Sequence, residues 1–417
     1  MERGPEQCPR FGRRALAAFF GLTIALFAAC APSPGPVPPV EDFGDEPIGF
    51  AISAAEKELG ERIETVGERR AGAPMRETVL CAVARNLAHE VVSNGIDRID
   101  NLTTERIGEK MREMGSVDNA FRSYVFNELT LERAAAQLET MIDDELHEKH
   151  HTHYGVGAVR TWWPPGYMVG VLLVRKGVQI EPVKRRMNVG EDLFVQGRLL
   201  NGSEPVTLWV QGPVETRTMD LTFNYEGRFS RMIRLSDNGR YHVEIMTTTA
   251  NGPEVAALFE VVAGRESATP RTTRPRPTPL AQPLVTPEGM RARLIELVND
   301  ERAREGVLPV GEDSSLNAVA QRYAEEILQN RRVVHVSPDS GDLVDRAKAV
   351  GIDFVKISEN IAVNRNVDVV HEDLMRSPSH RRNIVDDQVD RIGVGVAIDP
   401  DGGHVYVVEN FARLRSP

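Results

Sequence analysis

One short motif in the sequence has residue types and spacing that could perform catalysis, an H-E-x-x-H pattern from His147 to His151. On a helix these two histidines would share a face and could bind zinc, while Glu148 activated a water molecule, as in metalloproteases. His153 follows closely, but residues 152–155 should end the helix at once, and the longer H-E-x-x-H-x-x-G-x-x-H form is not met. A motif this short also arises by chance, so a protease and adventitious surface metal binding are both alternatives.

The last third of the chain contains a series of longer motifs. In chain order they are Leu297-Val298-Asn299-Asp300-Glu301-Arg302 with Gly306; Ala320 with Tyr323-Ala324; His335; Ser358-Glu359-Asn360-Ile361-Ala362; Ser377-Pro378-Ser379-His380-Arg381-Arg382-Asn383-Ile384; Gly393-Val394-Gly395; and Val408-Glu409-Asn410-Phe411. Together they resemble the CAP superfamily (cysteine-rich secretory protein, antigen 5, pathogenesis-related 1; SCP domain) in its disulfide-free bacterial form, over residues 288–415. The resemblance implies an α-β-α sandwich, in which an antiparallel sheet lies between helical layers.

The resemblance also implies a cleft that contains His335, Glu359 and His380, with Asn360 and Ser377 beside it. Two imidazoles and a carboxylate could bind a divalent metal, zinc above all, or act as general acid and base. The family often has a glutamate as a fourth cleft residue, and Ser377 stands at that position here. Three ligands would leave a metal site open or loosely held. The same side chains could instead be structural, with Glu359 capping backbone amides and His380 bonded to it.

The functional prediction follows from this cleft. The family has many proposed roles, among them lipid binding, protease activity and protein interaction. We therefore predict a cleft that binds a divalent metal or a small or lipid ligand, in a protein that is not a dedicated enzyme. The alternative is a metal-dependent hydrolase that acts through this cleft or through the 147–151 motif. His371 and His404 match no motif and are expected at the surface.

Helices must position the cleft residues. Apolar side chains at i, i+3 and i+4 spacing predict one helix near residues 290–298 and a second at 316–328, which Asp313 or Ser314 can cap. A third helix is predicted from about residue 367 to 376. It should stop at Ser377, because the residue before a proline avoids helical geometry. Residues 399–403 then predict the turn of a β-hairpin.

Two Pro-rich stretches divide the chain, a tether at residues 30–48 and a Pro/Thr/Arg linker at 265–287. Residues 49–183 begin with helical patterns and end in a Gly155-Val156-Gly157 strand with a hairpin partner, the order that recurs around Gly393-Val394-Gly395. We interpret them as a degenerate CAP-like α+β domain, although such strands can also arise independently. Short strands in residues 184–264 resemble an immunoglobulin-like β-sandwich. The predicted fold class is α+β.

The N-terminus indicates export. An apolar run over residues 15–29 follows Arg10, Arg13 and Arg14. This order of a basic start and a short apolar run predicts that residues 1–29 are a lipoprotein signal peptide. The next residue, Cys30, follows two alanines and resembles the lipidated cysteine of bacterial lipoproteins. Removal of Cys8 with the signal and lipidation of Cys30 would leave Cys81 alone, so the mature chain could form no internal disulfide.

Charge restricts the partners. The chain has 50 Lys and Arg against 61 Asp and Glu, a formal net charge of −11. Because phosphate backbones bind basic surfaces, a nucleic-acid partner is not expected. The expected partners are the membrane, through the anchor at Cys30, and a small ligand, lipid or envelope protein. The expected location is the cell envelope, on the periplasmic side or at the surface.

Overall fold

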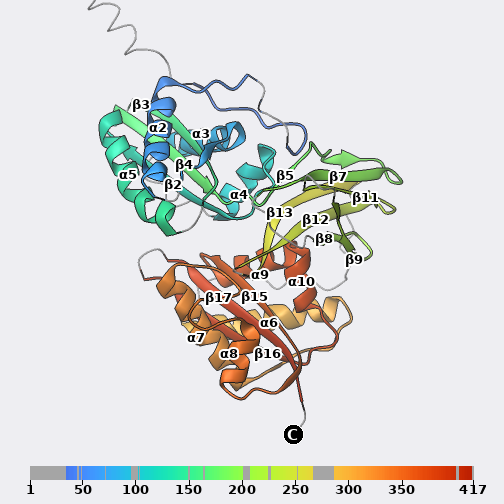
Figure 1. Ribbon diagram of the computed structural model, residues 1–417. Helices are drawn as coiled ribbons and strands as arrows, with labels where there is room; N and C mark the ends of the chain where they lie inside the picture. The colour runs from blue at the N-terminus through green and yellow to red at the C-terminus, as the bar shows by residue number, and fades with distance from the viewer. Residues whose placement is uncertain are drawn as a thin grey trace, which may run out of the picture.

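The computed structural model describes residues 34–44, 47, 49–70, 72–94, 102, 104–148, 151–162, 165–200, 207–223, 227–250, 252–265, 286–400 and 403–415. These residues form three folded units in chain order (Figure 1). The predicted signal peptide, the predicted lipidation site Cys30 and most of the linker at 265–287 lie outside the described residues. No helix in the described part of the chain has both the length and the apolar character needed to cross a membrane.

The first unit packs helices against a four-stranded sheet of order β1-β3-β4-β2. Its helix α2 begins at a capping box, in which Ser53 and Glu56 each bond the other's backbone N–H. A buried ion pair between Glu56 and Arg85 joins α2 to α3. The elements are α2 (Ala54–Glu68), β1 (Met75–Arg76), α3 (Thr78–Asn94), α4 (Thr104–Glu113), β2 (Phe121–Glu128), α5 (Leu131–Glu148), β3 (His153–Trp162) and β4 (Pro165–Val174).

The second unit consists of two sheets that share one hydrophobic core. One sheet has the order β10-β11-β7-β5 and the other β6-β13-β12-β8-β9. Alternate residues of the strands, such as Val195, Phe229, Val243 and Phe259, enter the shared core. The strands are β5 (Val178–Ile180), β6 (Arg186–Met187), β7 (Asp192–Leu199), β8 (Thr207–Gln211), β9 (Thr216–Asp220), β10 (Thr222–Phe223), β11 (Arg228–Arg234), β12 (Gly239–Thr249) and β13 (Gly252–Ala263).

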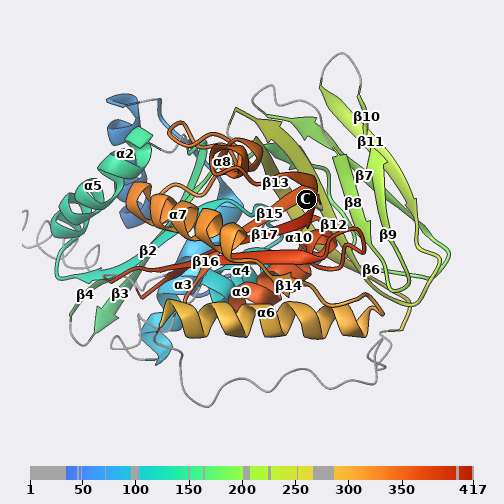
Figure 2. The ribbon, with the colours of Figure 1, turned by 90° about the horizontal axis from the view of Figure 1, so that it is seen from below.

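The third unit is a three-layer α-β-α arrangement around a sheet of order β14-β16-β17-β15. Helix α7 covers one face of the sheet and α6 and α9 cover the other (Figure 2). The expected helices are confirmed, including the end of α9 at Arg376, one residue before Ser377. The elements are α6 (Pro287–Arg304), β14 (Gly311–Glu312), α7 (Ser314–Asn330), α8 (Leu343–Ala349), β15 (Phe354–Asn364), α9 (Val367–Arg376), α10 (Pro378–Ile384), β16 (Arg391–Ile398) and β17 (Val405–Leu414).

Two glycines allow the sheet of the third unit to approach α7 closely. A Cβ atom built on Gly395 would lie 2.2 Å from backbone atoms of Ala320, and one on Gly393 would lie 2.2 Å from the backbone of Leu316. Real Cβ atoms do not come this near to a backbone, so only glycine fits at these positions. This explains the Gly-x-Gly pattern of β16.

The sheets of the first and third units have the same construction. In each, a two-residue strand runs parallel to the first strand of a hairpin, and an antiparallel edge strand, β2 or β15, follows the second. Gly155 and Gly157 on β3 approach α3 as closely as the β16 glycines approach α7. In the matched register, Ser123 on β2 stands where Glu359 stands on β15.

One expectation about the surface is wrong. His371 is buried on α9, with 6% of its surface exposed, and not at the surface as the lack of a motif suggested. The helix turns Val370, His371 and Leu374 toward the rest of the unit. A helical stripe facing a core can therefore include a histidine that the apolar pattern alone would leave outside.

Candidate functional site

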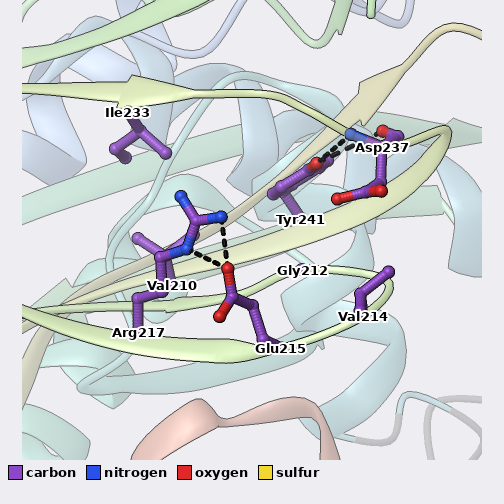
Figure 3. A pocket seen from close by; sticks show the side chains of 8 residues that line it. All are labelled: Val210, Gly212, Val214, Glu215, Arg217, Ile233, Asp237 and Tyr241. Carbon is purple, nitrogen blue, oxygen red and sulfur yellow. Dashed lines mark hydrogen bonds and ion pairs between the residues drawn. The ribbon is translucent and has the colours of Figure 1, made fainter.

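A cleft of about 950 Å³ lies where the three units meet. It is lined by His335 and His380 of the third unit, by the start of β2 in the first unit, and by residues 253–255 of the second. A pocket in the second unit, between Val210 and Tyr241, encloses only about 10 Å³, the room of a single water molecule (Figure 3). The cleft is therefore the better candidate for ligand binding.

His335 lies in the loop after α7 and contacts the carboxylate of Glu359. Its Nδ1 atom is 3.0 Å from Oε1 of Glu359 on β15, and the other carboxylate oxygen accepts a hydrogen bond of 2.6 Å from Arg346. The Arg346 guanidinium in turn stacks over the ring of Tyr323, 3.5 Å from its centroid. Since an ionised carboxylate only accepts hydrogen bonds, Nδ1 of His335 carries a proton and Glu359 has both oxygens engaged.

His380 lies on α10 and is held by a serine of its own segment. Its Nδ1 atom is 2.7 Å from Oγ of Ser377. Desolvation, and to a lesser degree the neighbouring His335 ring, lowers the pKa of His380 to about 3. The imidazole of His380 is therefore neutral at neutral pH, whereas a surface histidine at that pH is close to the midpoint of its own titration.

A buried carboxylate from the second unit completes this arrangement. Glu244 on β12 accepts hydrogen bonds from the backbone N–H of Ser379 at 2.9 Å, from the Ser379 hydroxyl at 2.7 Å and from the Ser377 hydroxyl at 3.1 Å. Burial raises the pKa of Glu244, and these hydrogen bonds oppose that shift. With Glu244 ionised, Ser377 donates its only proton to it, so Nδ1–H of His380 donates to Ser377 and Nε2 keeps a lone pair.

Sequence reasoning missed Glu244 for a physical reason. In β12, Tyr241, Val243 and Ile245 alternate into the sandwich core, so Glu244 is on the outward face, where an acidic residue is expected to meet water. It meets the third unit instead, and none of its surface is exposed. No pattern in the sequence distinguishes an outward residue that reaches solvent from one that reaches another unit.

The second unit also contacts the segment that contains His335. A Cβ atom on Gly252, at the β12–β13 turn, would lie 2.9 Å from Cβ of His335. Nearby, the guanidinium of Arg382 stacks over Trp209 of β8 at 4.9 Å. The second unit therefore packs against both histidine-bearing segments and forms one wall of the cleft.

Asn360 and Glu409 lie beneath the site and support α10. The Asn360 side chain donates to the backbone carbonyl of His380 and to Glu409, each at 3.2 Å, and accepts from Asn383 at 2.9 Å. Asn360 is completely buried, as is Glu409. The predicted position of Asn360 next to the cleft thus corresponds to a structural role in fixing the helix that presents His380.

The burial of Glu409 predicts a pH dependence of stability. Desolvation raises its pKa from 4.5 to about 7, so between these values the folded chain holds a proton that the unfolded chain has released. The free energy of unfolding should fall by about 3 kcal/mol as the pH rises through this window. Glu409→Gln removes this titrating group. Urea unfolding at pH 5 and pH 8 should therefore show the fall in unfolding free energy for the original chain and a much smaller fall for the variant. The lowered pKa of His380 has the opposite effect on the unfolding free energy, which it makes rise with pH below about pH 6.5. If the pH dependence of stability is the same in Glu409→Gln as in the original chain, it does not come from Glu409.

Of the predicted site residues, His335, Ser377 and His380 line the cleft, whereas Glu359 contacts His335 and Asn360 is fully buried, and together they do not form a metal-binding group. His335 pairs with Glu359, while His380 is bonded to Ser377. Over the described residues, no three His, Cys, Asp or Glu side chains are placed to hold a metal ion. Because both oxygens of Glu359 are engaged, this donor set does not fit a resident metal as it stands. Zinc binding stays a prediction.

The last histidine of the H-E-x-x-H motif lies outside helix α5. Helix α5 ends at Glu148, and His151 lies beyond it, with Nε2 3.3 Å from Glu145. The side chains of His147 and Glu148, and all of His150, lie outside the described residues. His151 therefore does not lie on the helix that contains residue 147, as the zinc motif requires, although it lines the cleft.

Comparisons with known proteins concern mainly the third unit. The family model for CAP, the cysteine-rich secretory protein family, matches residues 295–411. The protein YkwD of Bacillus subtilis is 32% identical over 104 residues, which are 25% of this chain and 40% of YkwD, so the match spans less than half of that relative.

Solved structures of similar proteins include an outer surface protein from Borrelia burgdorferi, 22% identical, with a TM-score of 0.30 over 33% of this chain and 100% of that one. An extracellular protein of Bacillus anthracis with an SCP domain is 19% identical, with a TM-score of 0.29 over 57% of this chain and 86% of that one. The family match over the three-layer unit agrees with the ordered motifs of the sequence. Residues 295–411 are therefore a CAP domain of the cysteine-rich secretory protein family.

Proposed function

We propose that this chain is an exported envelope lipoprotein whose CAP domain binds a small acidic, partly apolar ligand such as a lipid, and that it is not a dedicated enzyme. One observation carries the proposal: His335 and His380 line the same cleft, and the Nδ1 atom of each contacts a neighbouring side chain. This arrangement fixes the two rings and leaves their Nε2 atoms for a ligand.

The composition of the cleft supports the ligand class. Seven arginines line it against four carboxylates, although the whole chain is acidic. Apolar side chains are interleaved with them, among them Met246, Val255, Leu258, Ile361 and Leu374. A ligand with an acidic head and an apolar body would satisfy both kinds of lining.

Calorimetry on the chain from residue 30 onward tests the ligand, with laurate and Zn²⁺ as separate probes. We expect laurate to bind, and His335→Ala and His380→Ala each to weaken binding by at least about tenfold, or about 1.4 kcal/mol. His404→Ala is the matched control, because His404 lines the cleft outside the pairs described. Zinc binding that needs both histidines would favour the metal instead. If neither probe depends on these histidines, the proposed site is wrong.

The anchor and the location belong to the same proposal. The basic start, apolar run and Cys30 support it, and the similar proteins described as extracellular or outer surface proteins agree with an exported chain. Metabolic labelling with palmitate should mark the chain and should not mark Cys30→Ser. Labelling that persists in the variant would rule out this anchor.

We also propose that residues 49–183 are a degenerate CAP-like copy and that residues 184–264 are an immunoglobulin-like spacer. The shared sheet order and the matched glycine contacts of the first and third units support the copy. Ser123 at the register of Glu359 supports its degeneracy, because a hydroxyl there cannot hold a histidine as a carboxylate does. The histidine pair of the ligand site would then belong to the third unit alone.

A further inference from the structure

The open edges of two sheets line the cleft. β2 is the last strand in the sheet of the first unit, and β15 is the last in the sheet of the third. Residues 121–125 of β2 line the cleft without a break, and so do residues 361–363 of β15. Successive side chains of a strand point to opposite faces, so an unbroken run means that the strand's edge, and not one face, borders the cleft.

An open edge presents backbone N–H and C=O groups that can pair with another extended chain. Among the described residues, no strand pairs with the outer edge of β2 or of β15. The strands beside them in their sheets contribute little: of β17 only Tyr406 lines the cleft, and β4 contributes no residue. The backbone of an added strand would therefore meet two hydrogen-bonding edges in one cleft.

The charge of the cleft selects the occupant. Its seven arginines exceed its four carboxylates by three, and Arg122 on β2 and Arg365 just beyond β15 flank the two edges. Arg122 is 3.8 Å from its acidic neighbour Glu145, a loose contact, and its side chain is 37% exposed. An acidic chain would complement this surface, and a basic one would be repelled.

The linker of the chain itself is a poor occupant. Residues 265–287 contain Arg271, Arg274 and Arg276, so their charge has the wrong sign, and their many prolines lack the N–H that a ladder requires. We propose that the cleft binds an extended acidic peptide segment of another protein, which adds as a strand to β2, β15 or both. A segment of about five residues, some 17 Å long, would span residues 121–125.

This proposal does not rest on the histidine site. The histidines lie on the third unit, whereas β2 belongs to the first, so variants can separate the two. His335→Ala should weaken laurate and leave the peptide bound. Charge reversal at Arg122 should weaken the peptide by a larger factor than laurate, because Arg122 flanks β2 of the first unit, whereas the histidines lie on the third.

Fluorescence anisotropy on the chain from residue 30 onward tests the proposal. The probe is a short labelled peptide of alternating Glu and Val with blocked ends, and the control probe replaces Glu by Lys. Two further probes are N-methylated on alternate residues, one on the odd and one on the even positions. Each of them lacks the N–H donors along one edge of the peptide but keeps its charges. Arg122→Glu is compared with Arg198→Glu, a reversal on the second unit outside the cleft.

We expect the acidic probe to bind and the Lys probe not to bind. N-methylation in at least one register and Arg122→Glu should each weaken binding by at least about tenfold, while Arg198→Glu should leave it unchanged. Three results would overturn the proposal. The first is that both N-methylated probes bind as tightly as the unmethylated acidic probe. The second is that an acidic oligosaccharide at equal concentration displaces the peptide from the cleft. The third is that the chain dimerises through this cleft.

Discussion

Gly395→Val is expected to unfold the CAP domain. The first added carbon would lie 2.2 Å from the carbonyl carbon and oxygen of Ala320, which are backbone atoms of α7 and cannot turn aside as a side chain can. Either β16 separates from the helix or the helix shifts, and both expose the apolar core on that face. We expect a loss of more than about 4 kcal/mol, comparable to the severest core substitutions.

Thermal unfolding followed by calorimetry checks this expectation, because the loss of the third unit should remove its part of the transition. Gly311→Ala is the control. Gly311 lies on β14 of the same sheet, and a Cβ there would be 3.3 Å from the end of the Arg391 side chain, which can move. A Gly395→Val protein with an unchanged transition would show that β16 does not approach α7 as described.

Glu244→Ala is expected to have the second largest effect, and it acts between units. The substitution leaves the Ser379 N–H and the hydroxyls of Ser379 and Ser377 without the carboxylate that accepts from them. Each buried donor without a partner costs about 1–3 kcal/mol. The Ser377 hydroxyl can donate to His380 instead, so the two donors of Ser379 remain and the total loss should be about 2–6 kcal/mol. We expect the contact between the second and third units to weaken before either unit unfolds.

The same variant should change the proton on His380. Once Ser377 no longer donates to Glu244, its hydroxyl proton is available to Nδ1 of His380, and the ring proton moves to Nε2. Nitrogen–proton NMR correlations of the imidazole distinguish the two tautomers. Glu260→Ala, on the neighbouring strand, is the control, because Glu260 pairs with the exposed Arg240. A His380 ring that keeps its proton on Nδ1 in Glu244→Ala would show that Glu244 does not position it.

The elements of the third unit were largely predictable because their causes are local. The apolar stripe of α7, its cap at Asp313 and the end of α9 before Pro378 each depend on a few neighbouring residues. α10 was not predicted, since a helix of seven residues leaves little periodicity. In the first unit, α4 was missed for a different reason: the helix is polar on average, and its buried stripe consists of only a few residues, such as Ile107 and Met111.

The candidate site was predictable only in part, because it depends on contacts between units. The family motifs identified His335, Glu359 and His380, of which His335 and His380 line the cleft and Glu359 contacts His335. They could not show that Arg346 takes one oxygen of Glu359, since no motif distinguishes it from the other arginines of the domain. Nor could they show that Glu244 accepts hydrogen bonds from the segment of His380. The packing of the second unit against the third depends on the shape and chemistry of their surfaces, which the periodicity of the sequence does not reveal.

The recurrence of one sheet order in a single chain raises a problem for folding. Hairpins of the same design at β3–β4 and β16–β17 each pack their glycines against the backbone of a helix, so each could pair with the helix that belongs to the other. Differences between the two units oppose this exchange. The buried Glu56–Arg85 pair beneath β3 requires a charged partner, which the Ala320–Gln321 turn of α7 does not offer. We therefore expect this interior ion pair to contribute less to stability than to the discrimination between native and swapped assembly.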